Sequence, residues 1–237
     1  MSLNYFEAEK KYIFQTYKRN PVLFVRGDGK YLWDTTGKKY LDFFSGLSVS
    51  SIGHCNKKVV NAITTQSGKL IHVSNLYYTK PQIELAKMLC DLSFGEKVFF
   101  SNSGAEANEC AIKLARKFNR LVQSPKSKVQ RYEIISFNNS FHGRTIATLS
   151  ATGQEKFQKG FEPLLNGFKF AEFNNLSSVK KLISPKTCAI IVEPIQGEGG
   201  VYLAEKNFLR GLREICDRNK LLLIFDEVQC GLGRCGE

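Results

Sequence analysis

Short apolar runs alternate with turn residues in the N-terminal part of the chain. The runs Leu23–Val25, Tyr31–Trp33 and Tyr40–Leu41 are separated by Gly27-Asp-Gly29 and by Thr36-Gly37. Glycine-rich turns between short runs of this kind are typical of neighbouring strands joined by hairpins. The pattern therefore predicts an antiparallel meander.

From residue 57 onward, longer segments with apolar residues at helical spacing alternate with short, continuous apolar runs. Helices are predicted over 57–70, from Pro81, over 105–119 and over 208–218, and strands at 98–100, 133–137, 189–192 and 221–225. Most of these strands have no polar face, which indicates a mainly parallel sheet covered by helices on both sides. The predicted fold class is therefore α/β.

Composition and charge limit the classes of partner. The chain has 237 residues, of which 43% are hydrophobic and 24% charged, so it is long enough to bury a substantial core. Its formal net charge of +12 raises nucleic acid or an anionic membrane surface as partners. The lysines, however, are spread along the chain, and their short clusters are not interleaved with stacking aromatic residues. We expect small-molecule partners, with no nucleic acid and no membrane.

Cysteine usage and the N-terminus both bear on the cellular compartment. The number of cysteines, seven, is odd and cannot form a complete set of intramolecular disulfides, and no C-x-x-C pair occurs. Residues 1–14 mix acids, lysines and aromatics without the apolar core of a signal peptide, and no later stretch has the length of a membrane span. Reduced thiols and a cytoplasmic location are expected.

A candidate phosphate-binding segment joins a predicted strand to a helix at Ser101-Asn-Ser-Gly-Ala-Glu-Ala-Asn108. Ser103, Gly104 and Ala105 would lie at the helix N-terminus, where unpaired N–H groups and the helix dipole favour an anion. The alternative is an ordinary helix cap, because Ser103 followed by Glu106 three residues later matches a capping box. Both interpretations stay open on these residues alone.

Two consecutive acids, Asp226 and Glu227, follow the predicted strand 221–225. Open α/β sheets bind ligands at the carboxyl ends of their strands, and a buried carboxylate needs a cation or a hydrogen-bond donor. A protonated pyridine nitrogen would satisfy Asp226, and the carboxylate would keep that ring an electron sink. The alternatives are a loop-capping role or a Mg²⁺ site beside a nucleotide phosphate, although no G-x-x-x-x-G-K-[ST] motif occurs.

Two further segments follow predicted strands. In Phe141-His-Gly-Arg144 the aromatic ring could stack on a flat cofactor and Arg144 could hold a carboxylate, the alternative being a surface arginine. His142 is a weak candidate for a base or a metal ligand, and no metal site is expected. In Glu193-Pro-Ile-Gln-Gly-Glu-Gly-Gly200 the glycines permit close backbone approach around Glu198, or form a simple turn. A G-x-G-x-x-G match at 231–236 has neither a helix nor a ribose-binding acid after it, which argues against a dinucleotide site.

Together and in this order, these segments closely resemble the class III aminotransferases of the type I pyridoxal-phosphate fold. The resemblance covers nearly the whole chain and includes segments 17–26, 37–42, 53–54 and 74–78. It implies the mainly parallel, seven-stranded-type sheet of a large cofactor-binding domain, incomplete here, in residues 75–237. Residues 1–74 would supply an N-terminal segment and part of a smaller α+β domain.

The resemblance also implies a role for each candidate site residue. The residues that would bind pyridoxal 5'-phosphate are Ser103, Gly104, Ala105, Phe141, Asp226, Val228 and Gln229. Among these, Asp226 would be the catalytic partner of the ring nitrogen, and Phe141 and Val228 would lie on opposite faces of the ring. Gln229 would donate to the ring hydroxyl. Substrate would be bound by Tyr17, by Arg144 at the α-carboxylate and by Glu198 at the ω-amine end.

Within the family, the segments Ser74-Asn-Leu-Tyr-Tyr78 and Pro81-Gln82 are most similar to acetylornithine aminotransferases. These imply a homodimer that moves the δ-amino group of N2-acetylornithine to 2-oxoglutarate in arginine biosynthesis. Ornithine δ-aminotransferases are the nearest alternative, but they typically carry a tyrosine where Leu47 stands. Other ω-aminotransferases of the class, including those that use succinyl-diaminopimelate, also remain open.

The Schiff-base lysine of this family lies a few dozen residues after the Asp-Glu-Val-Gln segment, so no lysine of this chain is assigned that role. We expect a truncated or fragmentary form of the enzyme. The alternative from a different functional class is a non-catalytic protein that binds the cofactor or a partner without transamination.

Overall fold

A computed structural model describes residues 3–123 and 129–236 of the chain. The chain divides into two compact units, Met1–Leu85 and Ala86–Glu237. The domain boundary expected between residues 74 and 75 stays a prediction. None of the helices in the described ranges combines the length and the apolar character that a membrane span requires.

The first unit contains a three-stranded antiparallel sheet and several helices. Strands β1 (Phe24–Asp28), β2 (Tyr31–Asp34) and β3 (Lys39–Leu41) pair in the order β1-β2-β3, which confirms the predicted meander. The helices are α1 (Tyr5–Tyr12), α2 (Ser45–Ser48), α3 (Lys57–Ser67) and α4 (Lys80–Asp91), the last of which runs across the boundary between the units.

A single acid organises the turn between β2 and β3. Within residues 3–85, Asp34 is the one residue that is buried. Its carboxylate accepts hydrogen bonds from the side chain and backbone of Thr36, from the backbone of Lys38 and from the Tyr40 hydroxyl at 2.8 Å. The bond from the Thr36 side chain, supported by the others, lowers the pKa of Asp34 below its usual value.

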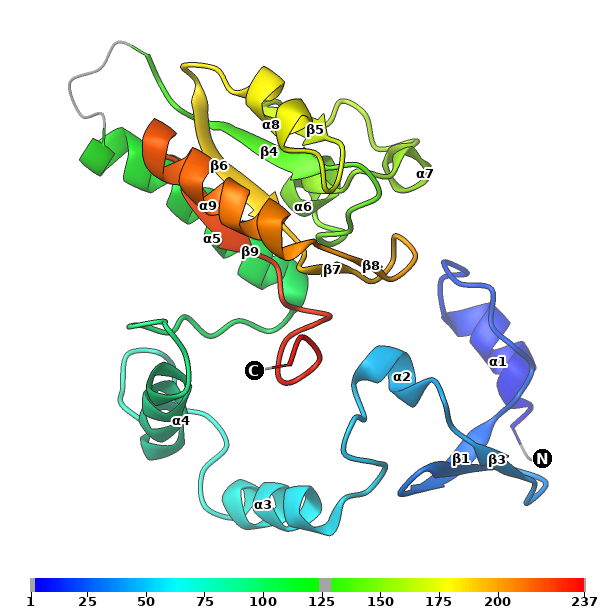
Figure 1. The fold of residues 1–237 in the computed structure, drawn as a ribbon. Coiled ribbons are helices and arrows are strands. Elements are labelled where there is room, and N and C mark those ends of the chain that lie inside the picture. Colours follow the sequence, from blue (N-terminus) through cyan, green and yellow to red (C-terminus); the bar gives the residue numbers. More distant parts are fainter. Residues whose placement is uncertain (1–2, 124–128, 237) are drawn as a thin grey trace. The chain divides into compact units, whose positions relative to one another are not determined.

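The second unit is built on a parallel sheet (Figure 1). Its strands β4 (Glu133–Phe137), β5 (Phe168–Ala171), β6 (Thr187–Val192) and β9 (Leu222–Phe225) lie in the order β5-β4-β6-β9, and every pairing is parallel. The predicted α/β class is confirmed. Sequence reasoning missed β5 because Lys169 interrupts its apolar run. The amine of Lys169 pairs with Glu133 on the neighbouring strand at 2.6 Å.

Helices cover both faces of this sheet. They are α5 (Gly104–Phe118), α6 (Ile146–Ala151), α7 (Glu155–Gln158), α8 (Leu176–Leu182) and α9 (Lys206–Asn219), with a π-helical turn at Asn119–Gln123 and a hairpin of β7 (Ile195–Gln196) and β8 (Tyr202–Leu203). Because successive strand residues point to opposite faces, Ile135 and Ile190 join a core with α8 and α9, whereas Ile134 and Ile191 join a core with α5 and α6. Both cores are apolar, as the unbroken hydrophobic strands predicted.

The strand predicted at 98–100 is wrong for this structure. Residues 97–101 form no strand, and in the described ranges no strand pairs with them. A strand needs a hydrogen-bonded neighbour, and neither edge strand of the described sheet, β5 or β9, pairs with these residues. An apolar run alone therefore does not make a strand.

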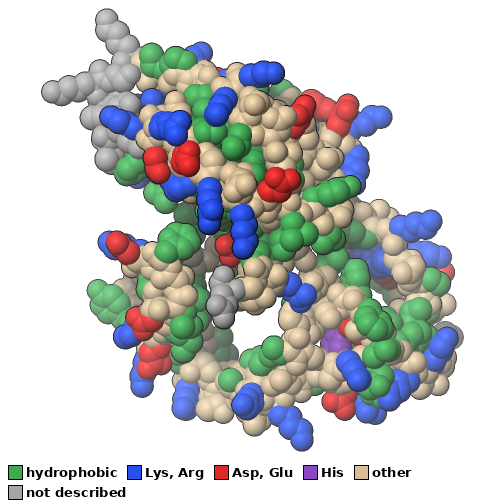
Figure 2. Space-filling model, in the orientation of Figure 1, with side chains coloured by type: hydrophobic (Ala, Val, Ile, Leu, Met, Phe, Trp, Pro, Cys, Tyr) green, Lys and Arg blue, Asp and Glu red, His purple; other side chains and the backbone are tan. Residues whose placement is uncertain are grey.

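Basic side chains do not gather into one patch on the face seen in Figure 2. Lys and Arg side chains are scattered there among hydrophobic and acidic ones. On this face, the described basic side chains therefore do not line a groove for a polyanion.

Candidate functional site

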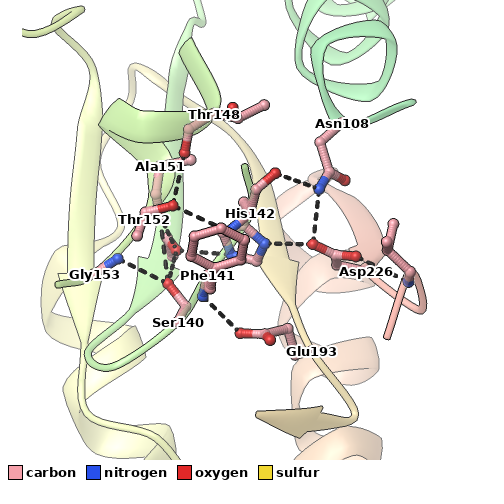
Figure 3. A network of polar contacts seen from close by, with 12 residues as sticks. Asn108, Ser140, Phe141, His142, Thr148, Ala151, Thr152, Gly153, Glu193 and Asp226 are labelled. Atoms are coloured by element: carbon pink, nitrogen blue, oxygen red, sulfur yellow. Dashed lines mark hydrogen bonds and ion pairs between the residues drawn. The ribbon is translucent and has the colours of Figure 1, made fainter. Parts of the chain in front are cut away.

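The carboxyl ends of the central strands bring the candidate segments together (Figure 3). Val192 of β6 and Phe225 of β9 are paired, so the next residues, Glu193 and Asp226, follow neighbouring strands at the same edge. The backbone N–H of Asp226 donates to the carbonyl of Val192 at 2.8 Å. The third strand, β4, leads into the loop that carries Phe141. This edge is where ligands of open α/β sheets bind.

Asp226 lies at the centre of a buried hydrogen-bond network. Its side chain is 4% exposed, and Oδ2 accepts from Asn108 Nδ2 at 2.8 Å and from His142 Nδ1 at 2.6 Å. Oδ1 accepts from the backbone N–H of Val228 at 3.1 Å. The prediction that Asp226 faces hydrogen-bond donors is confirmed, and these donors offset the cost of burying its charge.

His142 is held rigidly, which the sequence alone did not reveal. Its backbone N–H donates to Thr152 Oγ1 at 3.0 Å, and its carbonyl accepts from Asn108 Nδ2 at 2.8 Å. Nε2 lies 3.2 Å from Ser136 Oγ on β4. Asn108 was also missed. Its position four residues after Gly104, on the same face of α5, is the signal that could have found it.

The start of α5 is a helix cap that leaves backbone donors available. Ser103 Oγ accepts from the N–H of Glu106 at 3.2 Å, which confirms the cap interpretation. Glu106 Oε2 accepts from the N–H of Asn102 at 2.6 Å instead of completing the expected capping box. Among the described residues, none accepts a hydrogen bond from the N–H groups of Gly104 and Ala105. The cap and an anion at these amides are therefore compatible.

Two glycines bring neighbouring segments close to the start of α5. A Cβ added to Gly104 would lie 2.5 Å from Val228 Cγ1, so only glycine lets Val228 pack here. A Cβ added to Gly143, which has a φ of +135°, would lie 2.9 Å from the Cβ of Ala105. The segments that contain Phe141 and Asp226 thus both contact the candidate phosphate-binding turn, as the function expected from the sequence requires.

Phe141 and Arg144 lie on the open side of this network. The Phe141 ring is half-buried and packs edge-to-face on Phe157, with ring centroids 5.5 Å apart. Arg144 is exposed, and its guanidinium carbon lies 4.5 Å from the Phe157 centroid. In the parts of the chain that the structure describes, no acid forms an ion pair with Arg144. Its role in holding a carboxylate stays a prediction.

Glu198 lies in the turn of the β7–β8 hairpin, beside two other segments of the site. A Cβ on Gly197 would come within 3.0 Å of Gln229 Cγ, and one on Gly199 within 2.6 Å of the Asn139 carbonyl oxygen. The structure therefore brings Glu198 and Gln229 into one neighbourhood, although both side chains are exposed. Tyr17 belongs to the first unit, where it is exposed. The roles of these three residues stay predictions.

Glu193 is the residue of this edge that sequence reasoning overlooked. It is 5% exposed, and Oε2 accepts from the N–H of Phe141 at 3.0 Å. Burial raises the pKa of its carboxyl group to about 8, and the negative charges of Asp226 and Glu198 act in the same direction. An acid that follows the buried strand next to the Asp226 strand is the signal that was available in the sequence.

Comparison with known proteins identifies relatives along nearly the whole chain. The chain is 52% identical over 233 residues to an acetylornithine aminotransferase of Methanocaldococcus jannaschii, which aligns with 98% of this chain and 58% of the relative. It is 49% identical over 229 residues to a succinylornithine transaminase of Yersinia enterocolitica, with 96% of this chain and 55% of the relative aligned. The chain thus spans little more than half the length of these relatives.

Solved structures share the fold. The ornithine aminotransferase of Toxoplasma gondii superimposes with a TM-score of 0.90 at 32% identity, covering 97% of this chain and 54% of that one. An ω-transaminase of Pseudomonas jessenii in complex with PMP gives a TM-score of 0.88 at 29% identity, covering 96% of this chain and 57% of that one. The expected fold of pyridoxal-phosphate-dependent aminotransferases is confirmed. Since the family model for class-III aminotransferases matches residues 12–237, the chain belongs to the class-III aminotransferase family.

Proposed function

We propose that this chain forms the cofactor-binding part of an aminotransferase that moves the δ-amino group of N2-acetylornithine to 2-oxoglutarate by means of pyridoxal 5'-phosphate. The observation that carries the proposal is the buried carboxylate of Asp226, held at the sheet edge beside the start of α5. The names of the most similar relatives support the choice of an acylated ornithine.

The donor and acceptor pattern of Asp226 fits a pyridine nitrogen. A carboxylate oxygen accepts about two hydrogen bonds. Oδ2 already accepts two, from Asn108 and His142, whereas among the described residues Oδ1 accepts one, from Val228. Oδ1 therefore has room for one more donor, such as a protonated ring nitrogen. At the other end of the site, the N–H groups of Gly104 and Ala105 suit a phosphate.

Different residues of this chain would have different roles in the reaction. When bound, pyridoxal phosphate supplies an electron sink for the carbanion that forms during amino transfer. Asp226 would hold the proton on the ring nitrogen, and His142 and Asn108 would fix that carboxylate in place. Phe141 and Val228 would hold the ring between them, and Gln229 would donate to its hydroxyl group. These roles keep the cofactor oriented and its ring positively charged.

Substrate recognition is assigned to exposed groups, of which Arg144 and Glu198 belong to the second unit and Tyr17 to the first. N2-acylated ornithines carry an α-carboxylate and a free δ-amine. The exposed guanidinium of Arg144 suits the carboxylate, since a planar guanidinium donates two parallel hydrogen bonds. Glu198 would shape the amine end, and Tyr17 would complete the substrate contacts. A homodimer and a cytoplasmic location belong to the same proposal.

The test compares the purified 237-residue chain with a form extended through the family's lysine segment. Each is mixed with pyridoxal phosphate, and the absorbance of the bound cofactor is recorded before and after borohydride. Glutamate formation is then measured from 2-oxoglutarate with acetylornithine, succinylornithine or ornithine. We expect the extended form to bind the cofactor and to turn over the acylated substrates faster than ornithine.

Different failures of this test have different meanings. Cofactor binding without glutamate formation from any acylated ornithine would refute the substrate. Absence of cofactor binding in both forms would refute the assignment of Gly104 and Asp226, and would reopen a nucleotide-binding function. Cofactor binding by the unextended chain but not by the extended form would favour the non-catalytic alternative.

Gly104→Ala should weaken pyridoxal phosphate binding and destabilise the second unit. The new Cβ would meet Val228 Cγ1 at 2.5 Å and displace the side chain expected on the ring. Overpacking of this kind costs about 1–3 kcal/mol. Cofactor titration and chemical unfolding would measure both effects. Gly68→Ala is the matched control, because its nearest contact would be an ordinary 3.6 Å. Unchanged cofactor affinity in Gly104→Ala would contradict the placement of Val228 on the ring.

A further inference from the structure

Glu193 joins the two loops that border the candidate cofactor site. Its Oε2 accepts from the N–H of Phe141, at 3.0 Å, in the loop between β4 and α6. Glu193 itself lies two residues before β7, at the base of the β7–β8 hairpin whose turn contains Glu198. One buried residue thus links the loop that carries Phe141 and His142 to the hairpin that carries Glu198.

The same two loops contact each other at further points, so a shift of one loop would affect the other. Gln196 Nε2 donates to the Asn138 carbonyl at 3.0 Å, and the backbone of Gly199 packs against the Asn139 carbonyl. Of these contacts, the one from Glu193 is made to Phe141 itself. A displacement of the Glu193 carboxyl group would therefore act directly on the backbone of Phe141.

Glu193 differs from Glu133, an acid on the same sheet that is held by an ion pair. Glu133, at the opposite end of the sheet, pairs with Lys169 and accepts from Ser184. Glu193, by contrast, forms no ion pair with any Lys or Arg of the described residues. A buried acid without a cationic partner is costly, and such acids concentrate at functional sites.

We propose that Glu193 is a positioning residue of this site, which holds the loop of Phe141 against the base of the hairpin that carries Glu198 through its hydrogen bond from the Phe141 backbone. The proposal rests on the proposed function and deepens it. The carboxyl group performs this role in its neutral form, because the carbonyl oxygen of a protonated acid still accepts N–H bonds.

The surroundings of Glu193 favour that neutral form. Its charged neighbours are Asp226 after β9 and Glu198 in the hairpin, and both disfavour a further negative charge. On the β4–α6 loop, the ring of His142 is turned toward Asp226. Burial is the main reason that the pKa of Glu193 rises to about 8. Ionisation above this pH would place Glu193 against Asp226 and Glu198 and loosen the two loops.

The test uses the extended protein and the circular dichroism of its bound cofactor, which reports a fixed ring orientation. Glu193→Gln keeps the shape and the acceptor oxygen, whereas Glu193→Ala removes both. Each variant is measured from two pH units below the pKa of about 8 to one unit above it, together with kcat and KM. Glu133→Gln serves as the control for replacing a glutamate on the same sheet, at its other end.

We expect Glu193→Ala to lose most of the cofactor signal and to lower kcat by about 100-fold, since small misplacements of reacting groups cost this much. Below pH 8, Glu193→Gln should have the same cofactor signal and kcat as the unaltered protein. Above pH 8 both quantities should decline in the unaltered protein but not in Glu193→Gln. Equal loss in Glu193→Gln and Glu193→Ala, or no loss in either, would overturn the proposal. So would a loss of the same size in Glu133→Gln.

The cofactor signal of the unaltered protein separates the proposed function from the role of Glu193. An unaltered protein that gives no cofactor signal would overturn the proposed function, and the role of Glu193 with it. An unaltered protein with a normal signal, beside a Glu193→Ala variant with the same signal, would leave the proposed function intact and remove Glu193 from it.

Discussion

Replacing Asp226 by asparagine should lower kcat/KM for acetylornithine by about 10³-fold in the extended protein, since loss of one preorganised electrostatic contact costs up to that factor. The amide has nearly the same shape but carries no negative charge, so it would not keep the ring nitrogen protonated. It would also turn an NH₂ group toward the donors of Asn108 or Val228, which surround the present carboxylate. The measurement is the steady-state rate of glutamate formation.

A surface acid provides the matched control. Asp217→Asn removes a carboxylate that is 65% exposed and pairs with Arg213 on α9. We expect its rate to remain that of the unaltered protein, because exposed pairs contribute little. Retention of most activity in Asp226→Asn would contradict the assignment of Asp226 as partner of the ring nitrogen. Cofactor binding should persist in the variant, which separates a loss of chemistry from a loss of binding.

Glu193→Gln should make the protein more stable than the unaltered form at alkaline pH. The folded pKa of Glu193, about 8, lies above its ordinary value of 4.5, so the folded state holds the proton more tightly than the unfolded state. The stabilisation by Glu193 is therefore complete below pH 4.5 and is lost as the pH rises through 8. The difference in the free energy of unfolding between variant and unaltered protein should grow by about 5 kcal/mol across this interval.

Urea unfolding at successive pH values would measure this difference. Glutamine mimics the protonated acid, so the two proteins should have similar stability at the acid end and should separate steadily toward the alkaline end. The control Glu133→Gln should not reproduce the gain, because ion pairing with Lys169 and a bond from Ser184 lower the pKa of Glu133 despite its burial. A constant difference over the whole interval would contradict a raised pKa for Glu193.

The sequence predicted those parts of the fold that depend on continuous apolar patterns. Strands β4, β6 and β9 were found because apolar residues dominate each of them and none contains a charged residue in its interior. The short strand β5 escaped because it contains Lys169, and residues 98–100 were assigned as a strand although nothing in the described structure pairs with them. Local pattern gives no information about pairing partners.

The residues of the candidate site also divide into those that a local pattern predicts and those that depend on which elements become neighbours. Asp226 and the turn at Gly104 were predicted because a strand end and a helix start are recognisable along the sequence. Asn108 and Glu193 were not assigned roles, since their functions depend on which strands and helices become neighbours. The pairing of Val192 with Phe225 places Glu193 beside Asp226, and only the sheet order reveals it.

The strand order of the sheet also sets a sequence of events during synthesis. β4 is the first of these strands to be made, β5 adds to one side of it, β6 adds to the other, and β9 joins outside β6. Each strand thus finds an open edge as it emerges from the ribosome, and none has to insert between two that are already paired. Asp226 directly follows β9, the last of these four strands to be made, so the central acid of the site is added to the growing chain together with β9.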